Sequence, residues 1–211
     1  MINIKKTPWL QKLLLSLSVP IYLPVLFFKY LGNGMNIKKN PFHDGKRELS
    51  GRKNVASSKD FLLGDVKVAA KAQNVTINDM LTSCLSASVK EYFESKGDMT
   101  TNEINIVIPA NIRFKHYPSV DKLKLENKFA VVPLRIPLKR HMKDALKAIP
   151  VATSKIRKQF GEIYATYVLT KLSVALMPYF ISNWYMNFSI MPFTFAFSNT
   201  PGILKQTTLN G

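Results

Sequence analysis

The stretch Phe193–Gly202, which reads FTFAFSNTPG, decides how the C-terminal part of this chain folds. Its first half alternates aromatic and small residues, a pattern that is typical of a buried β-strand. Asn199, Pro201 and Gly202 then form a turn signal, because proline fixes φ and glycine permits a positive φ. We therefore expect a strand over Phe193–Ser198 that ends at a shaped turn, as strands of α/β proteins do.

A helix is expected upstream, over Thr76–Lys96. Thr76 is a suitable N-cap, and Asp79 falls in the first turn, where a negative charge favours the helix dipole. Apolar residues recur at helical spacing through the segment, and Gly97 is suited to the C′ position that ends it. Cys84, the single cysteine of the chain, is expected to be a small buried residue of this helix.

Two β-branched segments predict strands. The first, Glu103–Ile108, ends at a proline and is followed by Asn111 and Arg113, and the second, Asn127–Ile136, begins with an asparagine. The remaining pattern predicts a short strand over Asn54–Lys59 and helices over Leu63–Gln73, Met142–Lys158 and Gly161–Leu176. This alternation of helices and strands predicts an α/β fold.

Four motifs, in this order, resemble the C-terminal half of the wax ester synthase/diacylglycerol acyltransferase (WS/DGAT) family. They are T-x-N-D at residues 76–79, P-x-N-x-R at 109–113, N-[KR]-F at 127–129 and F-x-N-x-P-G at 197–202. The resemblance covers residues 54–206 and implies an α/β, two-layer sandwich half of a chloramphenicol acetyltransferase-like (CoA-dependent acyltransferase) fold. One departure is Ile203, which stands where the family usually has a second proline.

The resemblance implies an O-acyltransferase that moves a fatty acyl group from acyl-CoA to diacylglycerol or a long-chain alcohol, giving triacylglycerol or wax ester. Acyl-CoA is a substrate, and neither a further cofactor nor a metal is implied. In the family, a histidine of the signature His-His-x-x-x-Asp-Gly acts as general base. This sequence lacks the signature, because the histidine that stands beside an Asp-Gly pair, His43, is followed directly by Asp44. We therefore expect no catalytic residue here, no activity of the chain alone, and a C-terminal half that is truncated at its end.

Strand ends and motifs together give the candidate site residues. Ligand contacts gather at strand ends of α/β proteins. Substrate binding or support of the acyl-CoA channel is therefore assigned to Asn111, Arg113, Asn199 and Gly202. Structural roles in caps and turns are assigned to Asn78, Asp79, Asn127 and Pro201. For Asn78 and Asp79, a supporting function at the interface between the two halves of the enzyme is the alternative. The guanidinium of Arg113 could bind either a phosphate of CoA or a carboxylate of the protein itself. For Asn199 and Gly202, turn formation without a role in binding is the alternative.

The charge of the chain bears on its partners. Its 211 residues include 30 Lys and Arg against 13 Asp and Glu, a formal net charge of +17. These basic residues are spread along the chain, and no zinc-finger, glycine-rich or aromatic RNA-binding motif accompanies them, so a nucleic acid partner is not expected. The charge suits an anionic membrane or lipid-droplet surface, or the phosphates of acyl-CoA.

Three regions are expected: an apolar, membrane-associated helical segment at 1–31, a linker at 32–53, and the acyltransferase domain at 54–211. The apolar run Leu13–Phe28 is short for a membrane span and contains Pro20 and Pro24, and no signal-peptide cleavage site follows it. We expect a pair of helices that lie in the membrane interface or pack on the protein body, with a true anchor as the alternative. Attachment of either kind places the protein on the cytoplasmic face of the endoplasmic reticulum or the plasma membrane.

A second uncharged stretch lies between Lys171 and Lys205. Pro178 and Pro192 divide it, so we expect a helix, then an aromatic connection at Tyr179–Tyr185, then the strand. The aromatic side chains are expected to fill the core, with an acyl-chain groove or contact with lipid as the alternative. A function of another class also stays open, a non-catalytic protein that binds lipid or membrane surfaces and retains only this half.

Overall fold

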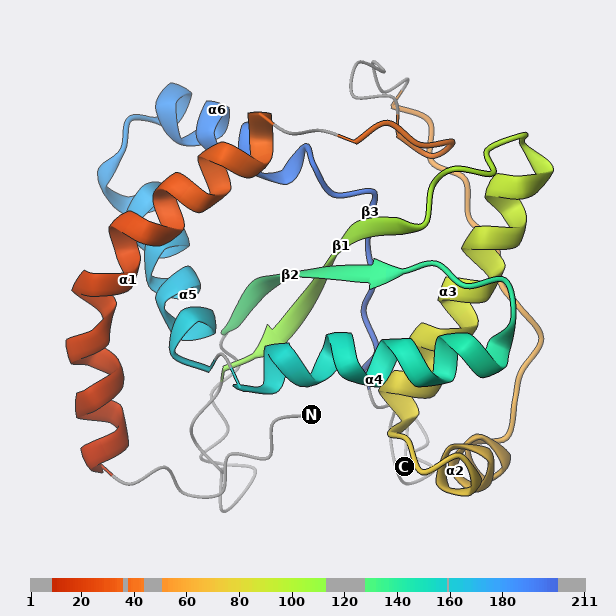
Figure 1. Ribbon diagram of the computed structural model, residues 1–211. Coiled ribbons are helices and arrows are strands. Elements are labelled where there is room, and N and C mark those ends of the chain that lie inside the picture. Colours follow the sequence, from red (N-terminus) through yellow and green to blue (C-terminus); the bar gives the residue numbers. More distant parts are fainter. Residues whose placement is uncertain (1–8, 36–37, 44–50, 113–127, 159, 201–211) are drawn as a thin grey trace, which may run out of the picture.

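A computed structural model describes residues 9–35, 38–43, 51–112, 128–158 and 160–200 (Figure 1). Within them the order is α1 (Trp9–Met35), α2 (Leu63–Ala72), α3 (Ile77–Ser95), β1 (Glu103–Asn111), β2 (Phe129–Pro137), α4 (Met142–Lys158), α5 (Phe160–Leu176), α6 (Tyr179–Ile190) and β3 (Phe195–Ala196). The six helices and the three-stranded sheet of these described residues form a mixed α/β structure, which confirms the expected class. The chloramphenicol acetyltransferase-like sandwich stays a prediction.

The sheet has the strand order β2-β1-β3. β1 and β2 are antiparallel along their whole length, from Glu103 opposite Pro137 to Asn111 opposite Phe129. β3 runs parallel to β1 and is two residues long, so the strand expected over Phe193–Ser198 is shorter than predicted. Parallel pairing sends β1 and β3 towards the same edge of the sheet.

β1 continues to Asn111, although the sequence predicts a strand end before Pro109. The carbonyls of Asn105 and Val107 accept hydrogen bonds from the backbone N–H groups of Thr194 and Phe197, so these odd-numbered residues of β1 face β3. Pro109 follows in the same alternation, two residues beyond the last pairing position of β3. The missing N–H of the proline therefore removes no hydrogen bond from the pairing with β2.

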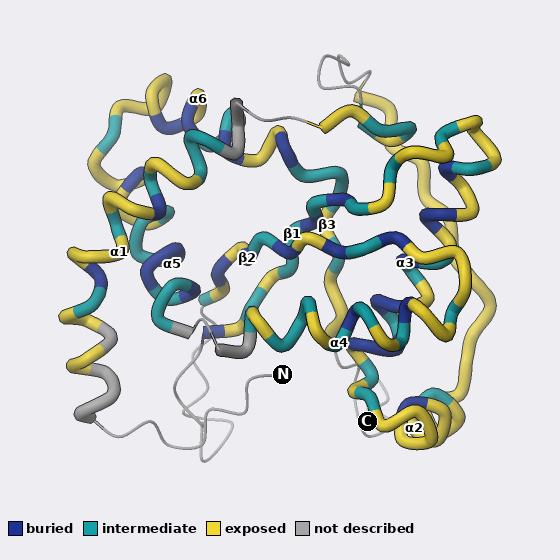
Figure 2. Tube along the Cα trace, viewed as in Figure 1, coloured by how far each residue is buried: buried dark blue, intermediate teal, exposed yellow. Residues whose placement is uncertain are grey.

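Helices α3 and α4 cover one face of the sheet. The main core consists of Val89 and Phe93 of α3, Ile104 and Ile106 of β1, Leu134, Ile136 and Leu138 in and after β2, and Ile149 of α4. Helix α5 extends this cover, because Ile163 packs with a second cluster at the far end of the two long strands. Figure 2 shows the buried residues gathered along β1, β2 and the inner sides of these helices. Burial of each large core side chain contributes about 1.5–3 kcal/mol.

Helix α3 has the ends that its sequence predicts. The hydroxyl of Thr76, the N-cap residue, accepts a hydrogen bond from the backbone N–H of Asp79, and the carboxylate of Asp79 accepts one from the backbone N–H of Thr76. At the other end, Gly97 has a φ of +84°, the left-handed conformation that a residue with a Cβ atom rarely adopts. Helix α2 also forms, one residue shorter than expected.

Helix α1 is one continuous helix of 27 residues with Pro20 and Pro24 inside it, so the expected division into a helix pair is wrong. Figure 1 shows that it bends part-way along its length and packs beside α5 and α6. The bend accommodates the two prolines, which remove hydrogen bonds without separating the turns on either side. Among the described helices, none combines the length and the apolar character that a membrane span requires.

Three further expectations are wrong. Residues 54–59 are exposed and form no strand, because no other described strand pairs with them. The aromatic connection is helix α6, whose N-cap is Pro178, a residue that tolerates a helix start because its missing N–H would be unpaired there. Cys84 is exposed, because it lies on the outer side of α3.

Candidate functional site

The T-x-N-D motif, residues 76–79, forms the first turn of α3 and contributes Asn78 and Asp79 to the candidate site. The Asp79 side chain is 2% exposed, and its Oδ2 atom accepts a hydrogen bond of 2.7 Å from the Thr76 hydroxyl. Its Oδ1 atom accepts one of 2.5 Å from the hydroxyl of Thr153 in α4. The buried carboxylate thus caps α3 and ties it to α4.

The neighbouring residue, Asn78, connects two motifs that lie far apart in the sequence. The side-chain amide of Asn199, beyond β3, donates a hydrogen bond of 2.5 Å to the Oδ1 atom of Asn78, across 121 positions. The two residues are exposed, so this bond lies at the surface beside the buried Asp79 network. Asn199 is therefore held against the first turn of α3.

The other candidate residues divide into described and undescribed ones. Asn111 is the last residue of β1 and is exposed, and β1 and β3 leave the sheet at the same edge. Arg113, Asn127, Pro201 and Gly202 lie outside the described residues. The structure thus brings Asn78, Asp79 and Asn199 together.

A hollow of about 550 Å³ adjoins this edge, between α2 and the start of α3. Lys67 and Lys71 of α2 line it, together with Asn74 and the capping residues Thr76 and Asp79. The two lysines are one helical turn apart, so their ammonium groups share a face of α2. No carboxylate of a described residue forms an ion pair with either of them. The hollow thus carries two lysines without an ion-pair partner in the described part of the chain, beside a helix N-terminus that the Asp79 carboxylate caps.

A comparison with known protein families bears on the part of the chain that contains Asn199. Residues 125–211 match the family model of the WS/DGAT C-terminal domain. The match confirms the resemblance of this part of the chain to the C-terminal part of the WS/DGAT family. The matched segment contains Asn199, whereas Asn78 precedes it, so the bond between the two asparagines joins the WS/DGAT C-terminal domain to α3. No curated protein and no solved structure matches the chain.

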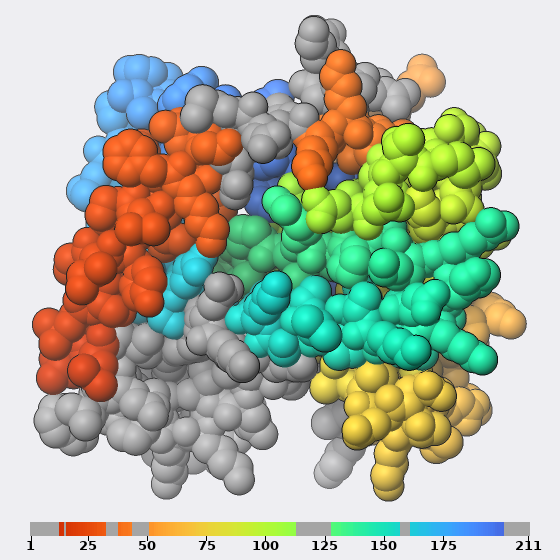
Figure 3. All heavy atoms as spheres, viewed as in Figure 1, coloured from red at the N-terminus to blue at the C-terminus, as the bar shows by residue number. Residues whose placement is uncertain are grey.

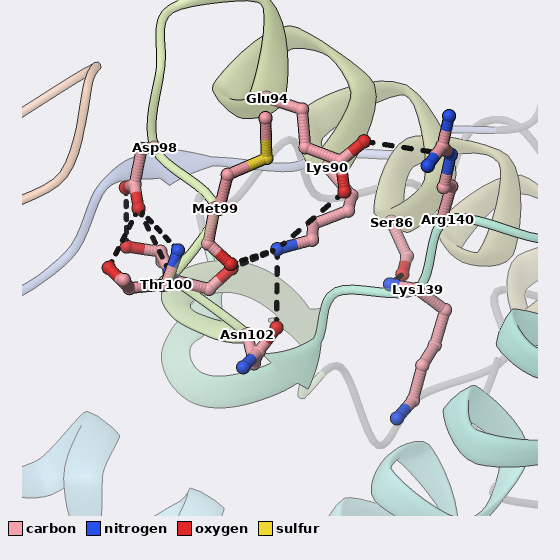
Figure 4. Close-up of polar contacts among 10 residues, drawn as sticks. Ser86, Lys90, Glu94, Asp98, Met99, Thr100, Asn102, Lys139 and Arg140 are labelled. Atoms are coloured by element: carbon pink, nitrogen blue, oxygen red, sulfur yellow. Dashed lines mark hydrogen bonds and ion pairs between the residues drawn. The ribbon is translucent and has the colours of Figure 1, made fainter.

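A second polar cluster, around Lys90, lies where α3 leads into β1, outside the segment that matches the WS/DGAT model (Figure 4). The Lys90 side chain is buried, and its ammonium donates hydrogen bonds to the carbonyls of Met99 and Thr101 and to the Asn102 side chain, at 3.2, 3.0 and 3.2 Å. The cluster therefore fixes the loop before β1. Sequence reasoning missed it, although Lys90 falls on the inner face of the helical period that Met80 begins.

Two further groups in this region have lowered pKa values. Hydrogen bonds from the Thr101 and Thr100 side chains and backbone hold the pKa of Asp98 at about 2. A hydrogen bond from Lys38, and the charges of Arg135 and Lys38, lower the pKa of Glu103. Glu103 lines a separate hollow of about 450 Å³ with Lys38, so a carboxylate already neutralises the basic group there.

The contact of α1 with α6 contains a buried tyrosine, Tyr185. The Tyr185 ring stacks on Phe27 of α1 at 5.1 Å, and its hydroxyl is buried without a hydrogen-bond partner among the described residues. Burial, and to a lesser extent the neighbouring Tyr30, raise the pKa of Tyr185 to about 12. Within the described residues, no group of His, Cys, Asp or Glu side chains gathers in a way that suits a metal ion.

Proposed function

We propose that this chain supplies the C-terminal half of an acyl-CoA-dependent O-acyltransferase that esterifies diacylglycerol or a long-chain alcohol. The observation that carries the proposal is the match of residues 125–211 to the WS/DGAT C-terminal domain, which indicates a family of acyltransferases. The products would be triacylglycerol or wax ester. The acceptor alcohol is a lipid, which agrees with the large apolar surface of α1 and α6.

The reaction transfers an acyl group from sulfur to oxygen. The acceptor hydroxyl attacks the thioester carbonyl, its C–O bond forms as the C–S bond breaks, and the hydroxyl proton leaves with the CoA thiol. The sequence holds no His-His-x-x-x-Asp-Gly signature, so we assign the general base to a histidine of the partner half. The part left to this chain is to bind and position the substrates.

For the phosphates of acyl-CoA we propose the hollow between α2 and α3. Its two lysines carry no paired carboxylate among the described residues, and they supply the positive charge, because the carboxylate of Asp79 already caps the helix start beside them. The other hollow is less suitable, because Glu103 forms ion pairs with Lys38 and Arg135 there. Held by the Asn78–Asn199 bond, the edge next to this hollow would form one wall of the acyl-CoA channel.

Equilibrium binding of palmitoyl-CoA to the purified chain tests the proposal. We expect saturable binding that free CoA competes for and that weakens as salt rises. The double variant Lys67→Glu/Lys71→Glu should raise Kd about tenfold, since two exposed charges near an anion each contribute up to about 1 kcal/mol. Lys59→Glu/Lys96→Glu is the matched control, because both lysines are exposed and lie away from the hollow. Equal losses in the two double variants would contradict the assignment of the hollow.

The second candidate function is a non-catalytic protein that binds lipid surfaces. The exposed apolar surface favours it as well, so binding to lipid does not separate the two functions. Specific recognition of CoA does, because a surface binder has no need to distinguish palmitoyl-CoA from palmitate. Palmitate binding that matches palmitoyl-CoA binding, with no competition by CoA, would favour the non-catalytic function.

A further inference from the structure

Helix α1 has an apolar outer side as well as an apolar inner side. Its inner residues Val19 and Leu26 are buried against the neighbouring helices. Its outer side carries exposed large apolar residues at helical spacing, namely Leu14, Leu17, Ile21, Val25 and Phe28. Figure 3 shows α1 as a continuous ridge along one edge of the molecule. Packing on the protein body therefore leaves these outer side chains exposed among the described residues.

A second apolar surface lies next to α1, at the corner where α5 meets α6. Leu176, Tyr179, Phe180 and Trp184 are exposed there, Tyr179 to 83% and Phe180 to 71%. Pro178, between the two helices, makes the corner, which projects at the same side of the molecule as α1 (Figure 1). The expectation that these aromatic side chains fill the core thus fails for three of them, whereas Tyr185 is buried.

The composition of the corner suits a lipid interface. From Leu172 to Thr200 the described chain carries no charged side chain, whereas surfaces of soluble proteins intersperse charges among apolar residues. Tyrosine and tryptophan combine an apolar ring with a polar group, and they concentrate at the boundary between lipid and water. Lys171, exposed on α5 just before the uncharged stretch, can extend its ammonium group to the headgroups.

The geometry and charge also favour lipid over a protein partner. The corner projects from the molecule, and a projecting apolar wedge enters a fluid interface without requiring a matching groove. The net charge of +17 attracts the whole chain to an anionic surface. A contiguous exposed apolar patch of this kind marks an interaction site and not a random surface.

We propose that the α5–α6 corner and the outer side of α1 form one docking surface for an anionic bilayer interface. The aromatic residues of the corner enter the headgroup region, and the outer residues of α1 lie along it. Such docking would bring the protein to a lipid acceptor, and in this respect the inference rests on the proposed function. The docking itself needs no turnover, so it can be measured independently.

The test uses the two tryptophans of the chain. Trp9→Phe leaves Trp184 as the single tryptophan, whose emission reports the corner. Vesicles contain phosphatidylcholine alone or with about 30% phosphatidylserine, which gives the surface a negative potential. On anionic vesicles we expect a blue shift of the emission and quenching by brominated phosphatidylcholine. A fluorophore on Cys84, which is exposed on α3, should show neither change.

Phe180→Asp is the decisive variant, and Phe61→Asp is its matched control. Phe61 is 67% exposed and directly precedes α2, which lies on the opposite side of the molecule from α1, α5 and α6 (Figure 1). We expect Phe180→Asp to weaken vesicle binding about tenfold or more, because binding strength follows the apolar area inserted. Both variants should keep the circular dichroism spectrum, since neither side chain is buried. Palmitoyl-CoA binding should be unchanged in Phe180→Asp, which separates a failure of docking from a failure of the proposed function.

Three results would overturn the proposal. One is vesicle binding without quenching of Trp184, which would leave α1 as the sole contact. Another is equal vesicle binding by Phe180→Asp and Phe61→Asp. The last is a blue shift that depends on protein concentration and needs no vesicles, which would assign the surface to a second copy of the chain.

Discussion

Replacement of Asp79 by alanine should destabilise the protein more than the loss of an ordinary helix cap does. The carboxylate caps α3 through Thr76, and the loss of a cap costs about 1 kcal/mol. It also accepts the 2.5 Å bond from Thr153, and a hydrogen bond to a charged group contributes about 1.5–3 kcal/mol. Part of this second loss is recovered, because the Thr153 hydroxyl lies 3.2 Å from the carbonyl of Pro150 and can donate to it instead.

The expected cost of Asp79→Ala is therefore about 2–3 kcal/mol. Urea unfolding followed by circular dichroism measures it, and the midpoint should fall by about 1 M. Asp144→Ala is the control: Asp144 also lies in the first turn of a helix but is exposed, so its removal should cost about 0.5 kcal/mol or less.

A double-mutant cycle isolates the link between the two helices. Thr153→Val removes the hydroxyl that donates to Asp79. The double variant Asp79→Ala/Thr153→Val should lose about 1 kcal/mol less free energy of unfolding than the two single variants lose in sum. A loss below about 0.5 kcal/mol for Asp79→Ala, or a coupling of zero, would refute the reasoning that Asp79 joins α3 to α4.

Three other perturbations probe the groups around the site. Lys90→Met should cost about 3 kcal/mol in urea unfolding, because the carbonyls of Met99 and Thr101 lose a buried donor; an unchanged midpoint would contradict this role. Tyr185→Phe should raise the free energy of unfolding by up to about 1 kcal/mol, since it removes a buried hydroxyl without a partner, and a loss of stability would point to a missing partner group. It should also remove the decline in stability as the pH rises from about 10, the ordinary pKa of tyrosine, to about 12. The lowered pKa of Asp98 predicts stability that is present above about pH 4 and is lost as the pH falls towards about 2, and Asp98→Asn should flatten that limb of the acid titration.

The sequence predicted correctly those helix ends and strands that depend only on the chemistry of neighbouring residues. The cap at Thr76, the glycine at Gly97 and the β-branched strands need no distant partner to be recognised, and each is present. Helix α6 was missed because its aromatic residues favour strands and Pro178 resembles a break, whereas a proline at a helix start is tolerated.

Other features depend on partners that the sequence does not show. The inner face of α3 includes Ser83, Ser86 and Lys90, so an apolar pattern alone misplaces Cys84 on the inside. Ser86 is buried because its hydroxyl donates to the Pro137 carbonyl, 51 positions away, and accepts from the Lys139 backbone N–H. The bond between Asn78 and Asn199 likewise joins two motifs that the sequence marks separately but does not place together.

The measurement that tests the central claim most directly is ester formation by two halves. This chain would be expressed with an N-terminal half of a WS/DGAT enzyme that carries His-His-x-x-x-Asp-Gly, and the co-purified pair incubated with labelled palmitoyl-CoA and diacylglycerol or a long-chain alcohol. The account predicts labelled triacylglycerol or wax ester from the pair, and none from either half or from a pair whose signature histidines are replaced. Ester from this chain alone, or none from a pair that co-purifies, would contradict it.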